Sequence, residues 1–161
     1  MERNHNLETQ NSDESAFQMA RDTKKIDSKG RFFIPSKQKE ELGSEVIVTN
    51  SLDTGYLCVY SKERFEFIKS QIKKFNTMDP AARKIKREII GEHIEVNVDS
   101  QGRITVTPEL WERIGAQPGG EICVFSDEEK LDICTKEFYD NEDHNLGAIE
   151  GLETKYFVEG L

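Results

Sequence analysis

One nine-residue segment occurs twice in the chain, and this duplication constrains the fold more than any other feature. The segment at residues 26–34 reads IDSKGRFFI, and the segment at 98–106, displaced by 72 positions, reads VDSQGRITV. Seven of the nine positions are identical or exchange one apolar residue for another. A repeat at fixed spacing indicates a duplicated structural unit. Because each half of roughly 45 residues would bury little apolar surface alone, we expect the halves to share one core.

The similarity continues downstream, so each repeat has a predicted element order. Residues 46–48 match 122–124, and residues 57–63 match 131–137. Each Asp-Ser-x-Gly stretch is typical of a tight turn, which predicts a β-hairpin. A short helix should follow, capped by Ser36 or Thr107, and then two strands. We therefore expect repeats at 21–60 and 93–138.

A helical connector is predicted between the repeats, at residues 61–92. In its first helix Phe65, Ile68, Ile72 and Phe75 recur at three- and four-residue steps, which is the period of an amphipathic helix. Asp79-Pro80 supplies a cap and a first-turn proline for a second helix that runs through Ile90. Its apolar line is formed by Ala82, Ile85 and Ile89.

The two ends of the chain differ from this body. Residues 1–20 are polar and predict a disordered arm. Residues 139–161 form an acidic extension with scattered apolar residues. This composition is compatible with disorder and with docking on a neighbouring surface, and the sequence does not decide between them.

Charge is distributed unevenly, although the net charge is −9. Residues 21–97 carry +4, whereas 1–20, 98–138 and 139–161 carry −3, −5 and −5. A basic segment between acidic ones is compatible with a polyanionic partner such as DNA. No apolar run is long enough for a membrane span and no secretory signal is evident, so we expect a cytoplasmic protein without a membrane partner.

The residues do not combine into a catalytic or metal-binding motif. His5, His93 and His144 are isolated, no nucleophile stands in a recognisable motif, and no glycine-rich phosphate loop is present. The acidic residues near 140 lack the glycine of a calcium loop. Cys58, Cys123 and Cys134 occur in apolar runs and predict reduced core residues. We expect no enzyme, metal or cofactor.

Residues 27–35 and 99–104, together with Ala82-Arg83 and Arg87 between them, resemble the MraZ family. That family carries a D-x-x-x-R motif in each of two fused swapped-hairpin units related to AbrB and SpoVT regulators. The resemblance implies an α+β fold, a pseudo-two-fold β-barrel of two AbrB-like repeats with a helical hairpin between them. It also implies a nucleoid-associated transcription regulator that assembles as a ring and binds promoter direct repeats of a division and cell-wall gene cluster.

Carried onto this chain, the family motifs assign DNA contact to Arg31, with Asp27 as its partner, and to Arg103, with Asp99 as its partner. The planar guanidinium of Arg31 is suited to a guanine edge. The alternative for each pair is that Asp and Arg only close their own turn. That alternative is favoured for the second pair, because Gln101 replaces Lys29 and its surroundings are acidic.

Further cations extend this predicted surface. Lys24, Lys25 and Lys29 lie within eight residues of Arg31 and can meet phosphates. Arg83 and Arg87 either continue the phosphate contacts or form an ordinary solvated helix face. Useful affinity for double-stranded DNA would then require several linked subunits.

A second hypothesis is a swapped-hairpin antitoxin-like module that holds a protein partner through residues 139–161. The presence of two repeats in one chain argues against it, because such antitoxins usually carry one. Deleting the extension would distinguish the two functions.

Overall fold

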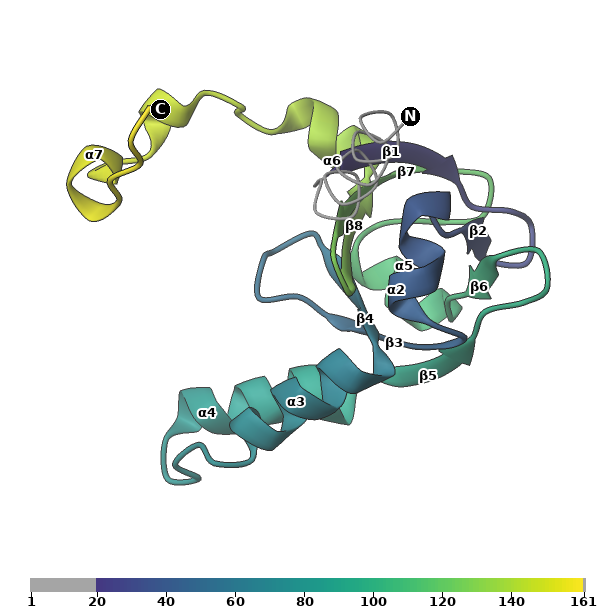
Figure 1. The fold of residues 1–161 in the computed structure, drawn as a ribbon, viewed down its shortest axis with the longest axis horizontal. Coiled ribbons are helices and arrows are strands. Elements are labelled where there is room, and N and C mark those ends of the chain that lie inside the picture. The colour runs from purple at the N-terminus through teal and green to yellow at the C-terminus, as the bar shows by residue number, and fades with distance from the viewer. Residues whose placement is uncertain (1–19, 161) are drawn as a thin grey trace, which may run out of the picture.

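The computed structural model describes residues 20–160, a mixed α/β fold built on an antiparallel sheet (Figure 1). The predicted arm lies outside these residues, except for Ala20, which begins the first strand. The first repeat contains β1 (Ala20–Lys25), β2 (Arg31–Phe33), the 3-10 turn η1 (Ser36–Gln38), α2 (Lys39–Leu42), β3 (Glu45–Asn50) and β4 (Leu57–Ser61). The second contains β5 (Ile94–Asn97), β6 (Arg103–Thr105), α5 (Pro108–Arg113), β7 (Glu121–Asp127) and β8 (Lys130–Thr135).

The strands pair between repeats rather than within each predicted hairpin. The six-stranded sheet has the order β1-β7-β8-β4-β3-β5, and β2 and β6 form a separate two-stranded sheet. The predicted turns are confirmed, but the prediction that each turn joins two mutually paired strands was wrong. Each repeat instead lends its first strand to the other repeat, because a shared core is buried only when both halves contribute.

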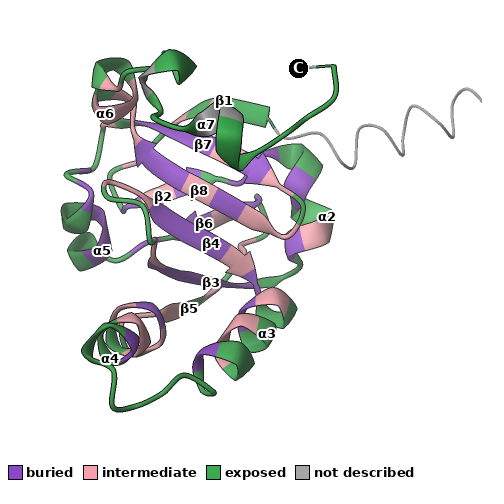
Figure 2. Cartoon of the chain, turned by 90° about the vertical axis from the view of Figure 1, so that its left-hand side faces the viewer, coloured by how far each residue is buried: buried purple, intermediate pink, exposed green. Residues whose placement is uncertain are grey.

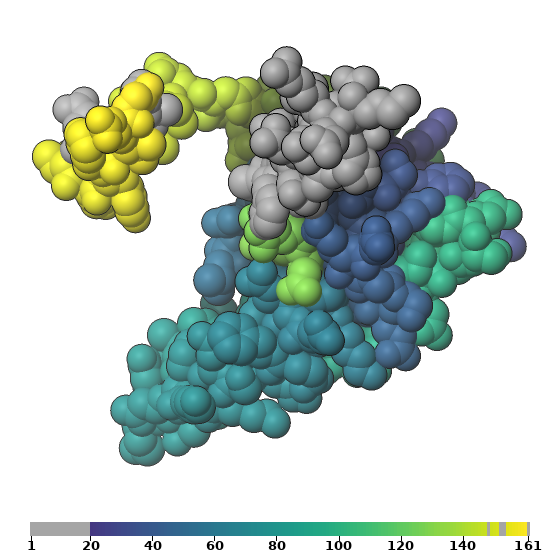
Figure 3. All heavy atoms as spheres, in the orientation of Figure 1, coloured from purple at the N-terminus to yellow at the C-terminus, as the bar shows by residue number. Residues whose placement is uncertain are grey.

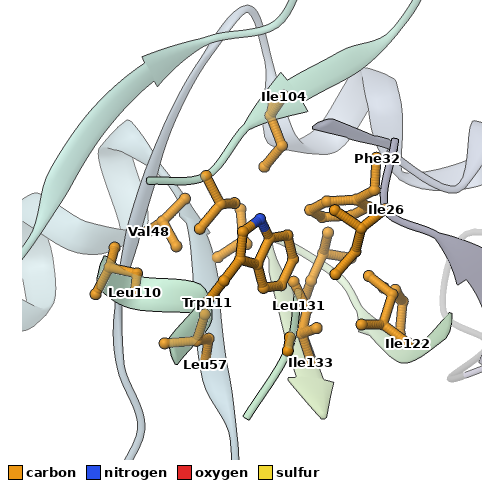
Figure 4. Packing of buried hydrophobic residues seen from close by; sticks show 14 of the residues in the cluster. Ile26, Phe32, Val48, Leu57, Ile104, Leu110, Trp111, Ile122, Leu131 and Ile133 are labelled. Carbon is orange, nitrogen blue, oxygen red and sulfur yellow. The ribbon is translucent and has the colours of Figure 1, made fainter. Parts of the chain in front are cut away.

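One hydrophobic core lies between the two repeats and is built from equivalent positions in both. Phe32 and Ile104, Leu57 and Leu131, and further matched pairs are all buried. Trp111 is the largest fully buried side chain and lies at the centre of this cluster (Figure 4). Figure 2 shows the buried residues concentrated in the strands, with exposed residues on the surrounding helices. The three cysteines are buried and unbridged.

The predicted connector forms a helical pair that packs on the outer face of β3 and β4. It consists of α3 (Lys62–Ile72), α4 (Pro80–Ile85) and the π-helix η2 (Lys86–Gly91). A second core cluster joins it to the sheet through Ile47, Phe65, Ile72 and Ile89. The buried Thr49 hydroxyl donates to the Ile89 carbonyl at 2.6 Å. A side chain of β3 thus satisfies a carbonyl near the C-terminal end of η2.

Most α-helices of the repeats and the connector begin with a polar side chain that caps the first turn. Ser61, Asp79 and Thr107 accept hydrogen bonds from the first turns of α3, α4 and α5. The predicted cap at Ser36 was wrong, because the segment after Pro35 begins as a 3-10 turn without a side-chain cap. A short 3-10 turn aligns fewer free amides for a cap than an α-helix does.

The C-terminal extension leaves the body after α6 (Lys136–Asn141). It contains the 3-10 turn η3 (Leu146–Ala148) and the short helix α7 (Leu152–Lys155). Figure 3 shows this segment projecting away from the rest of the molecule. None of the helices in residues 20–160 has both the length and the apolar character needed to cross a bilayer.

Candidate nucleic-acid interface

The two Asp-Ser-x-Gly-Arg turns have the same local geometry, and the aspartate produces it. Asp27 Oδ1 accepts the backbone N–H groups of Lys29 and Arg31, each at 2.9 Å. The backbone of Asp27 also accepts the N–H of Gly30 at 3.1 Å, with Gly30 at φ +81°. Aspartate and glycine are needed here because one side chain must satisfy two amides and one residue must adopt positive φ.

The second turn repeats this arrangement. Asp99 Oδ1 accepts the N–H groups of Gln101 at 2.9 Å and Arg103 at 2.8 Å, and Gly102 has φ +83°. Two segments 72 residues apart therefore adopt one structure, because the residues that determine the turn are identical.

Each aspartate also holds the arginine that ends its turn. Arg31 Nε donates to Asp27 Oδ2 at 2.6 Å, and Arg103 Nε donates to Asp99 Oδ2 at 2.8 Å. Within residues 20–160, the Nη atoms of Arg31 make no hydrogen bond. Its side chain is 25% exposed. The pair thus orients the guanidinium while leaving its outer edge open for a ligand.

Hydrogen bonding keeps both carboxyl groups ionised. The Arg31 backbone N–H, followed by the Arg31 guanidinium and the Lys29 N–H, holds the pKa of Asp27 below its usual range. The backbone N–H and guanidinium of Arg103 lower the pKa of Asp99 in the same way. Both ion pairs therefore persist at neutral pH.

The fold brings the two turns together at one end of the molecule (Figure 1). β2 and β6 pair antiparallel, with Arg31 opposite Thr105 and Phe33 opposite Arg103. Beyond the strands, the Ile34 N–H donates to the Gly102 carbonyl at 3.0 Å and the Val106 N–H donates to the Gly30 carbonyl at 3.1 Å. The two arginines consequently belong to one continuous surface.

Each turn is covered by a side chain from the opposite repeat, and the two side chains differ. Trp111 of α5 donates its indole N–H to the Gly30 carbonyl at 3.0 Å. Lys39 of α2 lies against the second turn, where a Cβ added at Gly102 would overlap its Cε and Nζ. Lys39 and Trp111 are themselves separated by 72 positions. The pseudo-symmetry thus places a lysine on one turn and a tryptophan on the other.

Lys39 supplies a cation that the sequence analysis missed. The second turn has Gln101 in place of Lys29, yet Lys39 reaches it from the first repeat and is exposed. The spacing of 72 residues was the available signal, since it aligns Lys39 with Trp111. Phe33 was also missed: it is 47% exposed, and its ring centroid lies 5.7 Å from the Arg103 guanidinium carbon.

The other predicted lysines lie beside the first turn. Lys29 is exposed on the turn, and Lys25 is exposed at the end of β1. Lys24 is half-buried and lines a small pocket with Lys37. The structure therefore gathers three of the predicted cations near Arg31, with Lys24 turned partly away.

The structure does not bring Arg83 and Arg87 to this surface. They belong to α4 and η2, at the end of the molecule opposite the paired turns (Figure 1). Arg83 Nη1 donates to the carbonyls of Thr77 at 3.0 Å and Met78 at 3.1 Å, which closes the loop between α3 and α4. Contact by these arginines with the DNA at the turns of the same subunit is therefore not supported.

Comparisons with known proteins agree with the repeated motif. Residues 17–88 match a family model described as "MraZ protein, putative antitoxin-like". A relative from Pseudoalteromonas translucida, named transcriptional regulator MraZ, is 34% identical over 112 residues, covering 67% of this chain and 72% of the relative.

Two further relatives carry the same name. One from Thermoanaerobacter sp. is 32% identical over 120 residues, covering 74% of this chain and 82% of the relative. One from Legionella pneumophila strain Paris is 28% identical over 140 residues, covering 84% and 91%. Together with the duplicated Asp-x-x-x-Arg turns, these similarities show that the chain belongs to the MraZ family of transcriptional regulators.

Proposed function

We propose that this protein is a sequence-specific DNA-binding transcription regulator whose paired turns contact the double helix. Its targets are promoter direct repeats of a division and cell-wall gene cluster. The observation that carries the proposal is that Arg31 and Arg103 lie on the same face of the paired strands β2 and β6, each held by an aspartate. The names of the relatives support regulation of transcription.

We further propose that the fold is the AbrB-like swapped-hairpin barrel. The exchange of β1 and β5 between the repeats supports it, as does the pairing of β2 with β6 that places both turns together. The proposed units are repeats at 21–60 and 93–138, a helical connector at 61–92 and an acidic extension at 139–161. In this arrangement the barrel presents the turns and the connector lies away from DNA.

Arg31 is the proposed base-reading residue. Its Nε is occupied by Asp27, so its two Nη groups can donate in parallel to the O6 and N7 atoms of guanine. Lys25 and Lys29 are placed to meet phosphates beside it, and Lys39 adds a cation at the second turn. Phosphate contacts fix position on the duplex, while the guanidinium supplies sequence discrimination.

Few contacts per chain imply that several chains act together. We propose a ring-like homo-oligomer that presents repeated copies of the paired turns to direct repeats in DNA. Linked subunits raise the effective local concentration of each binding surface and so increase affinity without new contacts. The acidic segments keep the remaining surface from binding DNA non-specifically.

The test is fluorescence anisotropy with a labelled promoter duplex. Arg31→Ala should lose about 1–3 kcal/mol of binding and discriminate less against a guanine substitution in the site. Arg31→Lys keeps the charge but should not restore discrimination. Lys73→Ala removes one positive charge from the connector and is the matched control. Equal affinity of Arg31→Ala and Lys73→Ala would contradict the proposal.

A second candidate is an antitoxin-like module that binds a protein through its tail. The exposed apolar residues of the extension, among them Tyr156 and Phe157, favour a binding role for it. Deleting residues 142–161 should leave DNA binding intact or strengthened if the protein is a regulator. Loss of a tightly bound foreign protein on deletion would instead support the second candidate.

A further inference from the structure

The helical connector carries an apolar groove that the proposed DNA contact does not use. The groove has a volume of about 280 Å³ and lies between α3, α4, η2 and the loop after β3. Its lining includes Ile68, Ile85, Phe75 and Leu52, of which Phe75 is 40% and Leu52 is 80% exposed. Large apolar side chains gathered in one open groove are typical of an interaction site.

The C-terminal extension is a second unpartnered apolar surface. Its exposed large side chains belong to neither core cluster of the described residues. They are Leu146, Ile149, Tyr156, Phe157 and Val158. Figure 3 shows the extension standing clear of the body. A segment of this kind gains stability only when another surface covers its apolar side chains.

Groove and extension are complementary in charge. The connector, residues 62–91, has a net charge of +5, whereas residues 139–161 have a net charge of −5. The basic residues of the connector include Lys69 on α3 and Lys74 just after it. Apolar contacts surrounded by opposite charges match the usual anatomy of a specific interface.

The beginning of the extension is anchored next to α6 and the loop after β3, and none of its described residues lines the groove of its own chain. Tyr56 donates to Glu142 at 3.2 Å, and the His144 ring lies 4.6 Å from the Tyr139 ring, with Nε2 bonded to the Tyr139 carbonyl at 2.9 Å. The loop that holds Glu142 through Tyr56 also carries Leu52 of the groove, yet Phe157 of the extension and Leu52 of the groove are 90% and 80% exposed, so neither covers the other within one chain. Figures 1 and 2 both draw the extension above the sheet and the connector below it.

We propose that residues 142–160 of one copy bind in the groove of a second copy. This inference rests on the proposed self-association and identifies its interface. Because the extension and the groove are different surfaces, the contact is head-to-tail, and repeating it closes a ring when the rotation between copies fits. The acidic and apolar composition of the extension then serves assembly rather than capture of a foreign protein.

Photo-crosslinking of the full-length chain tests the contact directly. Benzoylphenylalanine placed at Phe157, which is 90% exposed, should yield a covalent dimer whose crosslinks map to residues 50–91 of the other copy. Phe75→Asp, which puts a negative charge into the groove, should abolish this dimer. Phe67→Asp is the matched control, because Phe67 is exposed on α3 but does not line the groove. Crosslinks within one chain, to the sheet, to a different protein or to nothing would overturn the proposal.

Light scattering separates this inference from the proposed function. The wild-type chain and Phe67→Asp should be large assemblies, while Phe75→Asp and Phe157→Asp should fall to smaller species. Phe157 contacts no core, so its variant guards against misfolding as an explanation. If both variants keep the wild-type mass, self-association stands and the tail contact is overturned. If the wild type is a monomer, both fail, whereas anisotropy with DNA still tests the paired turns independently.

Discussion

The turn at Asp27–Arg31 and the turn at Asp99–Arg103 share a backbone, an ion pair and a positive-φ glycine, but they are covered differently. The first is sealed by the buried indole of Trp111, and the second is bordered by the exposed amine of Lys39. The residues inside each turn therefore determine its backbone shape, whereas a residue of the opposite repeat determines which side chain covers it. The first turn is thus covered by the buried core, whereas the second is bordered by a positive charge.

Among the variants that distinguish the two turns, Trp111→Ala should lower the free energy of unfolding the most. It removes a buried aromatic ring from the centre of the core together with the hydrogen bond to the Gly30 carbonyl. We expect a loss of about 3–5 kcal/mol in the free energy of unfolding. Lys39→Ala, at the equivalent position, should change it by no more than about 0.5 kcal/mol. Urea unfolding followed by circular dichroism measures both, and similar losses would contradict the assignment of different roles.

The two glycines provide the next test. Alanine at Gly102 must adopt positive φ, at a cost of about 1–2 kcal/mol, while the flexible Lys39 side chain can move aside. Alanine at Gly30 has the same backbone cost, and its Cβ would also lie 3.0 Å from the Val106 carbonyl oxygen. Gly30→Ala should therefore be the more destabilising variant in thermal or urea unfolding. The reverse order would mean that the Lys39 side chain cannot move aside from Gly102.

Asp27 and Asp99 should contribute to stability with the same pH dependence, because the same hydrogen bonds lower the pKa of each. Because folding lowers the pKa of Asp27 and Asp99, their stabilising contribution is fully present above their unfolded pKa of about 3.9. It is lost as the pH falls through the lower folded values. The stability difference between wild type and Asp27→Asn/Asp99→Asn should be constant from pH 8 to 5 and shrink below about pH 4. A difference that grows on acidification would show that the carboxylates do not stabilise the turns.

Lys39 should have its smallest effect on folding and a measurable one on DNA binding. If its amine meets a phosphate beside the second turn, Lys39→Ala should lower the slope of log affinity against log salt by about 0.9 per contact. Lys73→Ala should leave the slope unchanged. Anisotropy titrations at several salt concentrations give both slopes, and an unchanged slope for Lys39→Ala would remove it from the DNA surface.

Sequence reasoning identified the repeats, both turns and most caps because short-range residue chemistry determines them. Asp27 and Gly30 specify their turn through hydrogen bonds to neighbours two to four residues away. The strand exchange was not deducible from those residues alone, since a turn has the same local signals whether its strands pair with each other or with another repeat. Only the family resemblance pointed to it.

Residue roles at the candidate site were partly predictable for the same reason. The contact of Asp27 with Arg31 follows from their spacing and is confirmed by the structure. The positions of Lys39 against Gly102 and of Arg83 far from the turns depend on packing between distant segments. A basic residue on a helix carries no local sign of which end of the molecule that helix will occupy.

The exchange of first strands within a single chain has one more consequence. The same strand exchange between two identical chains would place the same side chain at both symmetry-related positions, so any change would alter both sites at once. Here a single gene encodes both halves, and position 39 is free to diverge from position 111. Fusion thus allows one half to specialise in holding the molecule together while its counterpart adapts to a ligand.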